Sequence, residues 1–322
     1  MLLDSRNKIS TDPRDKVYGI AGLTAARDDP RFIVDYSHTV FEVYRDVVKY
    51  VVTATQNLEI ISSGKGEVHP DWLPSWAPDW SQSTETGCSL IRFGGFNAAL
   101  GKAADATFDS SGRVLQVRGT RIGIIQSVAM LLDIPRVWMS YKNHNFYLLL
   151  CSICSWHELA KIAPGDEAYR LKAFQDVIWM EPYADREIEN LGARILKSLA
   201  VVIEHYMPKY PIDDILHDSL LRWQTKVREQ DRLAKVKEAC HYLCSVADWV
   251  NGRRFFLSSS RQMGLAPYRA EAGDKVCVLF GSSYPVILRP QEGYHTVVGD
   301  AYVHGIMYGE AMEGLSDGKY TI

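Results

Sequence analysis

A short run near the C-terminus holds the residues best suited to chemistry, namely Asp300, Tyr302, His304 and Glu310. Side chains alternate between the two faces of a β-strand, so Asp300, Tyr302 and His304 would share one face. A histidine beside a carboxylate is the usual general acid or base in proteins. The same residues could instead orient the loop that leaves the strand. The pattern therefore predicts either a proton-transfer site or a structural exit from a strand.

A second candidate is an aromatic cluster in a proline-rich stretch, formed by Trp72, Trp76, Asp79 and Trp80. Indole rings offer large, rigid apolar surfaces with one hydrogen-bond donor each. Such rings can wall a pocket for an apolar ligand. The alternative is a plug of core side chains beneath a long loop.

Polar groups near such a pocket would have to orient and polarise a substrate. Arg289 and the hydroxyl of Tyr302 can donate to a substrate oxygen that becomes negative, and His304 can donate or accept. With Asp300 they are the predicted catalytic residues, while the tryptophans, Asp79 and Glu310 are the predicted substrate-binding residues.

Closely spaced cysteines and histidines form a third candidate: Cys151, Cys154 and His157, and Cys240, His241 and Cys244. Paired cysteines at close spacing are typical of tetrahedral zinc sites. The first pair, however, lies in an apolar run at helical spacing, where a free cysteine behaves as a small hydrophobic residue. The sequence therefore predicts no metal site.

Familiar cofactor signatures are missing from the chain. It has no Gly-x-Gly-x-x-Gly, no phosphate-binding Gly-Lys-Ser/Thr, no His-Glu-x-x-His and no Gly-x-Ser-x-Gly. Redox, kinase, metalloprotease and serine-hydrolase activities are thus disfavoured. We expect no cofactor.

Composition is that of an ordinary globular protein, with 322 residues, 47% hydrophobic residues and a formal net charge of −3. This balance creates no global field for nucleic acid, so no nucleic-acid partner is predicted. No apolar run reaches the ~20 residues that span a bilayer, and the N-terminus lacks the apolar region of a secretory signal. Six cysteines in a chain of this length fit reduced thiols. We expect a cytoplasmic protein; its oligomeric state stays open.

Periodicity places these candidates on elements. Asp12-Pro13 predicts the start of a short helix that ends near Gly22, and apolar residues at a 3.6-residue period predict a helix over 38–55. A strand is expected at 58–62, a packed loop over 62–81, and one or two strands over 114–125.

Helical periodicity then runs through residues 145–250, and predicts four or five helices. The tail returns to strands separated by glycine-containing turns. The predicted tail strands are 254–258, 275–280, 286–289 and 295–303.

Two stretches carry recognisable motifs. The first contains Asp12-Pro13-Arg14-Asp15-Lys16-Val17-Tyr18, then Val34-Asp35-Tyr36-Ser37 and Leu73-Pro74-Ser75-Trp76-Ala77-Pro78-Asp79-Trp80-Ser81. The second runs from Met263-Gly264-Leu265-Ala266-Pro267 through Ala272-Gly273-Asp274 to Gly299-Asp300-Ala301-Tyr302-Val303-His304-Gly305. In this order they resemble the C-terminal region of the fungal heterokaryon-incompatibility (HET) family. In that family the first stretch follows an N-terminal effector domain, whose motifs are absent here.

The resemblance covers both ends of the chain, so the two ends are expected to pack together. The predicted fold is α+β: a mixed β core formed from both chain ends, with a helical lobe of four or five helices inserted between them. We expect a single compact unit over 1–322, with an α/β part over 1–125, a helical lobe over 145–250 and a β-rich part over 253–322.

Two functions remain open. In the first, the chain is a cofactor-free enzyme of fungal specialised metabolism that cyclises or isomerises an apolar small molecule, in a reaction such as a Diels-Alder cycloaddition. Orientation in a shaped pocket and one or two donors can lower such a barrier. In the second, the chain is a non-enzymatic HET-like binding or regulatory module. A large exposed apolar patch would favour the second.

Overall fold

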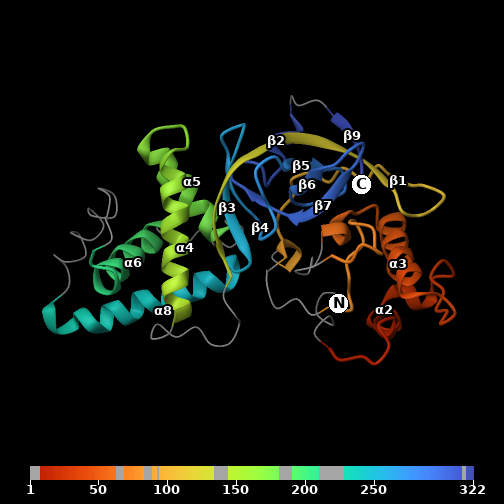
Figure 1. Cartoon of the computed structure of the whole chain (residues 1–322), viewed down its shortest axis with the longest axis horizontal. Coiled ribbons are helices and arrows are strands. Elements are labelled where there is room, and N and C mark those ends of the chain that lie inside the picture. Colours follow the sequence, from red (N-terminus) through yellow and green to blue (C-terminus); the bar gives the residue numbers. More distant parts are fainter. Residues whose placement is uncertain are drawn as a thin grey trace.

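The computed structural model describes residues 8–62, 69–82, 89–92, 94–133, 144–180, 191–209, 228–313 and 317–322. Figure 1 shows a central group of strands with a helical lobe on one side and the N-terminal helices on the other. The predicted α+β class is confirmed, including the insertion of the helices between two groups of strands.

The N-terminal part forms two helices, as expected. Helix α2 spans Asp15–Ala21 and helix α3 spans Val40–Thr55. Thr39 and Glu42 form a capping box at the start of α3, in which each side chain binds the other residue's backbone N–H. Short 3₁₀ helices occupy Ala25–Asp28 (η1) and Glu59–Ser62 (η2). The strand predicted at 58–62 is therefore wrong.

Nine strands follow in the described residues, and all of their pairings there are antiparallel. Their bounds are β1 Ala106–Phe108, β2 Leu115–Leu132, β3 Arg253–Ser258, β4 Met263–Pro267, β5 Lys275–Leu279, β6 Val286–Pro290, β7 His295–Asp300, β8 Tyr302–Val303 and β9 Asp317–Thr321. The predicted tail strands correspond to β3, β5, β6 and the β7–β8 stretch. The prediction missed β1, β4 and β9. Of the one or two strands expected over 114–125, the structure has one, β2, which continues to Leu132.

The strands close into a ring. Strand β2 pairs with β3, β3 with β4 and β4 with β8, while β7 pairs with β6, β6 with β5 and β5 with β2. Only Ala301 lies between β7 and β8, and its N–H donates to the carbonyl of Pro285 at 2.9 Å. The chain itself therefore joins the two ends of the path into a barrel. Register shifts in β2 mark where this strand bends around it.

Side chains from every wall of this ring meet in its interior. The interior core includes Ile122, Ile125, Phe256, Ala266, Val276, Val278, Ile287, Val298, Ala301 and Val303. At Gly264 a Cβ atom would lie 2.4 Å from the carbonyl oxygen of Tyr302 and 2.5 Å from the Phe256 ring. Glycine is thus the residue that lets β4 approach β8 this closely.

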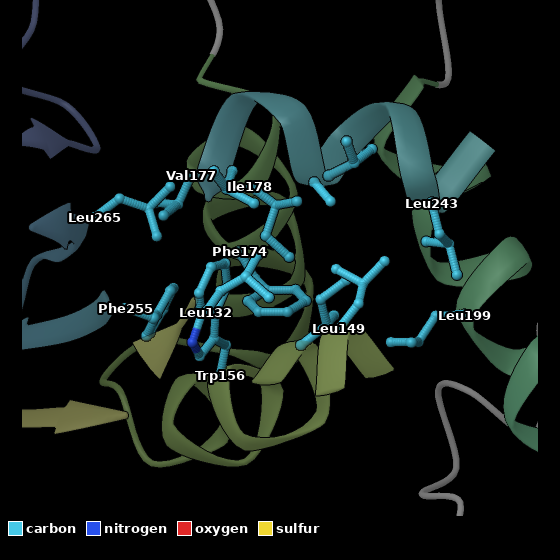
Figure 2. Close-up of a cluster of buried hydrophobic side chains, with 14 of the residues drawn as sticks. Leu132, Leu149, Trp156, Phe174, Val177, Ile178, Leu199, Leu243, Phe255 and Leu265 are labelled. Carbon is cyan, nitrogen blue, oxygen red and sulfur yellow. The ribbon is translucent and has the colours of Figure 1, made fainter. Parts of the chain in front are cut away.

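The helical lobe packs on one outer wall of the barrel. In the described part of the chain it comprises α4 (His144–Lys161), α5 (Glu167–Trp179), α6 (Leu191–Tyr206) and α8 (Arg232–Val250). The 3₁₀ helix η4 (Glu229–Asp231) precedes α8. Figure 2 shows Phe255 and Leu265 from the barrel beside Trp156, Phe174 and Val177 of the lobe. Trp156 also donates from Nε1 to the carbonyl of Met130 in β2 at 2.7 Å.

The N-terminal segments cover a second outer wall. Residues of α2, α3 and the 73–80 loop share a core with β2, β5, β6, β7 and β9. The amide of Val297 in β7 donates to the hydroxyl of Ser75 at 3.1 Å. The barrel is therefore covered on two sides by segments that precede it and interrupt it in sequence. No helix in the described residues is long and apolar enough to cross a membrane.

Candidate functional site

Asp300 lies at the point where β7 passes into β8, and its carboxylate is buried. Oδ1 lies 2.5 Å from a guanidinium nitrogen of Arg253, and the side chains of the pair are only 5% and 3% exposed. Oδ2 accepts from the Ser89 hydroxyl at 2.7 Å and from the Leu90 amide at 2.9 Å. Arg253 also donates to the carbonyl of Asp300 at 3.0 Å. The carboxylate thus ties β7 to the start of β3 and to the 89–90 segment.

This arrangement favours the structural reading of Asp300. Its carboxylate oxygens accept three hydrogen bonds, and a buried carboxylate is stable only when it is paired and hydrogen-bonded. Burial, and then the charges of Asp300 and Glu59, raise the pKa of the nearby Tyr284 well above its ordinary value. That phenol stays protonated, so it adds no further charge to this part of the barrel wall.

His304 faces a carboxylate, but not that of Asp300. Its Nδ1 lies 3.5 Å from Oδ2 of Asp176, in helix α5. The other oxygen of Asp176 contacts the ammonium of Lys172, and the ring of Tyr169 meets the imidazole edge-on with centroids 5.9 Å apart. The histidine therefore joins the barrel to the helical lobe. A pair of this kind can hold an imidazole in one orientation.

Tyr302 and Glu310 make contacts of other kinds. Tyr302 is buried in the core between barrel and lobe, and its ring lies 6.0 Å from that of Phe96. Glu310 is exposed at the start of the 3₁₀ helix η5 (Glu310–Met312), where its carboxylate accepts from the amide of Tyr308 at 2.8 Å. Each residue has a local structural partner.

Arg289 lies near the opposite end of β7. It pairs in register with Thr296, whereas Asp300 pairs with Val286. Its guanidinium binds both oxygens of Asp274, at 2.8 and 3.0 Å, and the carbonyl of Arg269 at 2.6 Å. The hydrogen bonds that Arg289 donates to Asp274 raise the pKa of Arg289. The structure therefore does not bring Arg289 together with Asp300 or His304.

The tryptophan cluster is divided between core and surface. Trp76 and Trp80 are fully buried in the core under the N-terminal segments, and Trp72 is 43% exposed. Trp76 donates from Nε1 to the carbonyl of Arg113 at 3.1 Å, and Trp80 packs edge-on against Tyr44. Asp79 accepts from the amide and hydroxyl of Ser81 within the same loop. Trp76 and Trp80 are thus core side chains beneath a loop, which is the alternative to a pocket wall.

The cysteine pairs lie on helices of the lobe, where Cys154 and Cys240 are buried. Burial raises the pKa of Cys240 to about 11, which makes it a poor nucleophile at neutral pH. His157 packs against Phe174 with ring centroids 5.2 Å apart. Over the described ranges, no three His, Cys, Asp or Glu side chains are placed to hold a metal ion.

Two residues that organise these contacts were not among the predicted ones. Asp176 is buried on α5 together with Phe174, Val177 and Ile178, and an acid beside such apolar residues is a signal for a buried partner. Arg253 begins β3 after Gly252, and nothing in the local sequence distinguishes it from the neighbouring Arg254. Arg253 meets its partner Asp300 only because the barrel closes, and the local sequence does not show this closure.

Comparison with known proteins agrees with this architecture. A family model described as the Het-6 beta-barrel domain matches residues 114–317. The matched range is continuous, so it includes the helical lobe, although the sequence motifs lie only at the two ends. The heterokaryon incompatibility protein 6, OR allele, of Neurospora crassa is 24% identical over 346 aligned residues, which cover 93% of this chain and 49% of that protein. No solved structure matches.

The chain spans about half the length of this curated relative. The family match, in contrast, covers well over half of the chain and takes in both the ring of strands and the lobe inserted into it. The chain therefore belongs to the family of proteins that carry the Het-6 β-barrel domain.

Proposed function

We propose that this chain is a non-enzymatic module that binds a full-length HET-family protein and regulates the incompatibility response. The observation that carries the proposal is the family membership, since the similar Neurospora crassa protein is a heterokaryon incompatibility protein. Cyclisation of an apolar substrate has no comparable support. Its proposed polar residues lie on different parts of the barrel, and two of its three tryptophans are core residues.

A binding module needs a surface, and the segment between α2 and α3 offers one. Four large apolar side chains are exposed on it: Leu23, Ile33, Val34 and Tyr36, of which Leu23 and Ile33 are 73% and 70% exposed. Grouped exposed apolar side chains mark protein interaction sites more often than isolated ones do. This segment is the part of the chain that we assign to partner binding.

Hydrogen bonds hold this segment in one conformation. Arg14 donates to the carbonyls of Tyr36 and His38 at 2.5 and 2.9 Å, and the hydroxyl of Tyr18 donates to the carbonyl of Asp35 at 3.0 Å. The phenol of Tyr36 donates to Asp15 at 2.5 Å. A surface that is already ordered loses less conformational entropy on binding.

The test is direct binding between the purified chain and the full-length Neurospora crassa HET-6 protein, measured by calorimetry. We expect a saturable complex, and we expect the Ile33→Ser/Val34→Ser variant to weaken it about fivefold or more, as the loss of contact residues does. Ile162→Ser is the matched control, because Ile162 is equally exposed (73%) but lies on the helical lobe. The proposal fails if no complex forms, or if the control weakens binding as much.

A cellular measurement separates regulation from mere binding. The chain and the full-length HET protein are expressed together in a fungal strain, and the viable fraction of cells is compared with that of strains that express either one alone. Regulation predicts a change that the Ile33→Ser/Val34→Ser variant reduces. Equal viability in all strains would contradict a regulatory role.

A further inference from the structure

Three basic side chains gather at the end of the molecule away from the helical lobe, where the β1–β2 hairpin lies beside α3 (Figure 1). Arg45 and Lys49 are one helical turn apart on α3, and Arg113 belongs to the hairpin. The guanidinium carbons of Arg45 and Arg113 lie 5.3 and 4.7 Å from the centre of one ring, that of Phe41. The ammonium of Lys49 lies 5.7 Å from the ring of Phe108. Two aromatic rings thus hold three cations close together.

The backbone of the hairpin allows this approach. Gly112 has a φ of +67°, and a Cβ atom there would lie 2.6 Å from the Lys49 ammonium nitrogen and 2.8 Å from Cδ of Arg45. Glycine meets both requirements, because it tolerates positive φ and leaves room for the two side chains. The turn therefore links the cations of α3 to Arg113.

Acidic groups neutralise only part of this charge. Asp46 binds Arg45 at 2.7 and 3.0 Å. Asp109 lies in the same turn, but its oxygens accept from the hydroxyl of Ser111 and from the amides of Arg113 and Val114. Within the described part of the chain, Lys49 and Arg113 have no acidic partner. Glu42 also attracts Arg45 through its charge. Lys49 and Arg113 are thus the two cations of the cluster to which no described carboxylate is bound.

A second cluster on the barrel provides an internal comparison. Lys102 and Arg118 flank the ring of Phe280, at 4.5 and 5.8 Å from its centre. There Arg118 is bound by both Asp105 and Asp317, at 3.3 and 3.5 Å. In this cluster two carboxylates bind one of the two cations, whereas in the first cluster one carboxylate binds one of the three.

We propose that Arg45, Lys49 and Arg113 form a binding site for a phosphoryl group. Guanidinium forks match phosphate oxygens in pairs, and an ammonium adds a compact positive charge. A phosphate dianion would relieve the mutual repulsion of the cations, which the aromatic rings attract but do not neutralise. The group is either a free phosphate or the phosphorylated side chain of a partner. The site is independent of the apolar surface on the α2–α3 segment.

Calorimetric titration of the full chain tests this site with three probes at an ionic strength of about 0.1 M: inorganic phosphate, a phosphoserine peptide, and the same peptide without the phosphate. We expect saturable phosphate binding, and we expect Lys49→Gln/Arg113→Gln to weaken it about tenfold or more, as befits the loss of two charge-assisted contacts. Tighter binding of the phosphopeptide than of phosphate identifies a phosphorylated partner as the source. Equal binding identifies free phosphate.

The matched control is Lys102→Gln/Arg118→Gln, which removes one lysine and one arginine charge from the cluster around Phe280. It should leave the affinity within about twofold of that of the unaltered chain, because Coulomb attraction between exposed groups farther apart than ~10 Å is screened. Circular dichroism confirms that each variant is folded, and the single variants Lys49→Gln and Arg113→Gln give the same comparison if the double variant unfolds. The proposal is overturned by absent phosphate binding, by full affinity in Lys49→Gln/Arg113→Gln, or by an equal loss in the control.

Discussion

The two ends of β7 carry charged groups in opposite settings. At the C-terminal end, Asp300 and Arg253 are almost completely buried, and the carboxylate accepts further bonds from the 89–90 segment. At the N-terminal end, His295 and Arg289 are partly exposed. The imidazole Nε2 of His295 lies 2.9 Å from the Lys275 ammonium, and its Nδ1 lies 3.3 Å from the carbonyl of Thr321 in β9.

The difference shows how position in the barrel decides what a charge does. The Asp300 end lies where the ring of strands closes and where the lobe meets the barrel wall. Water is excluded there, and the ion pair is held in one geometry. The His295 end lies beside the last strand, where partners can exchange with solvent. We therefore expect the first end to control the stability of the fold and the second to respond to pH.

The largest effect on stability is expected at the Asp300 end of β7, where the ring of strands closes. Asp300→Ala leaves the Arg253 guanidinium buried without its carboxylate, which should lower the free energy of unfolding by about 3–5 kcal/mol. Urea denaturation followed by circular dichroism measures it. The control is Asp105→Ala, which breaks an exposed pair with Arg118 and should cost less than about 1 kcal/mol. If Asp300→Ala and Asp105→Ala lowered the free energy of unfolding equally, the buried pair at the end of β7 would be no more important for stability than an exposed pair.

A smaller loss is expected for Arg289→Gln at the other end. Asp274 is 1% exposed, but it also accepts from the amide of Glu271 at 2.9 Å, so the carboxylate keeps one bond when the guanidinium is removed. Loss of a charge-assisted bond to a buried group costs about 1–3 kcal/mol. The same denaturation experiment measures this value. A loss as large as that of Asp300→Ala would mean that the ion pairs at the two ends of β7 contribute equally to the free energy of unfolding.

A still smaller coupling is expected between His304 and Asp176, which lie just beyond the closing end. Their 3.5 Å contact is partly exposed, so a double-mutant cycle with His304→Gln and Asp176→Asn should give a coupling of about 1 kcal/mol or less. Unfolding free energies of the four proteins at pH 6 supply the cycle. A coupling above about 2 kcal/mol would place this pair in the same class as Arg253–Asp300.

Sequence patterns predicted the elements better than their closure. The 3.6-residue period over 38–55 and the β-branched runs at 275–280 and 286–289 identify a helix and two strands, because each depends on local side-chain burial. Strand β4 was missed because it is short and begins with Met263-Gly264, where the glycine serves a contact with β8. Such a requirement arises from packing between distant segments.

The candidate site shows the same limit. Alternation correctly separates Tyr302, which faces the lobe, from Ala301 and Val303, which face the barrel interior. It does not reveal that His304 meets Asp176, because the two residues are far apart in the sequence and are joined by the docking of α5 on the barrel. Nor does it separate Arg289 from Asp300, because that distance is set by the register of β6 against β7.

The smallest expected effect is the pH response of the His295 end. Burial, and then the charge of Lys275, lower the pKa of His295 below its ordinary value of about 6.5. The Lys275 ammonium can donate only to a neutral Nε2, so both contacts of the imidazole fit the neutral ring with its proton on Nδ1. In the unfolded chain the imidazole takes up a proton near pH 6.5, whereas in the folded chain it resists until a lower pH.

The unfolded state thus binds more protons in the window just below pH 6.5, and stability falls there as the pH decreases. His295→Gln keeps an acceptor for Lys275 and cannot titrate, so its stability should depend less on pH between about 6.5 and 5 than that of the unaltered chain. The carboxylates with lowered pKa, such as Asp109 at about 2, lose their contribution only at more acidic pH. Urea denaturation at closely spaced pH values compares the two proteins. Identical pH profiles would contradict this prediction, because the imidazole would then titrate alike in the folded and unfolded chains.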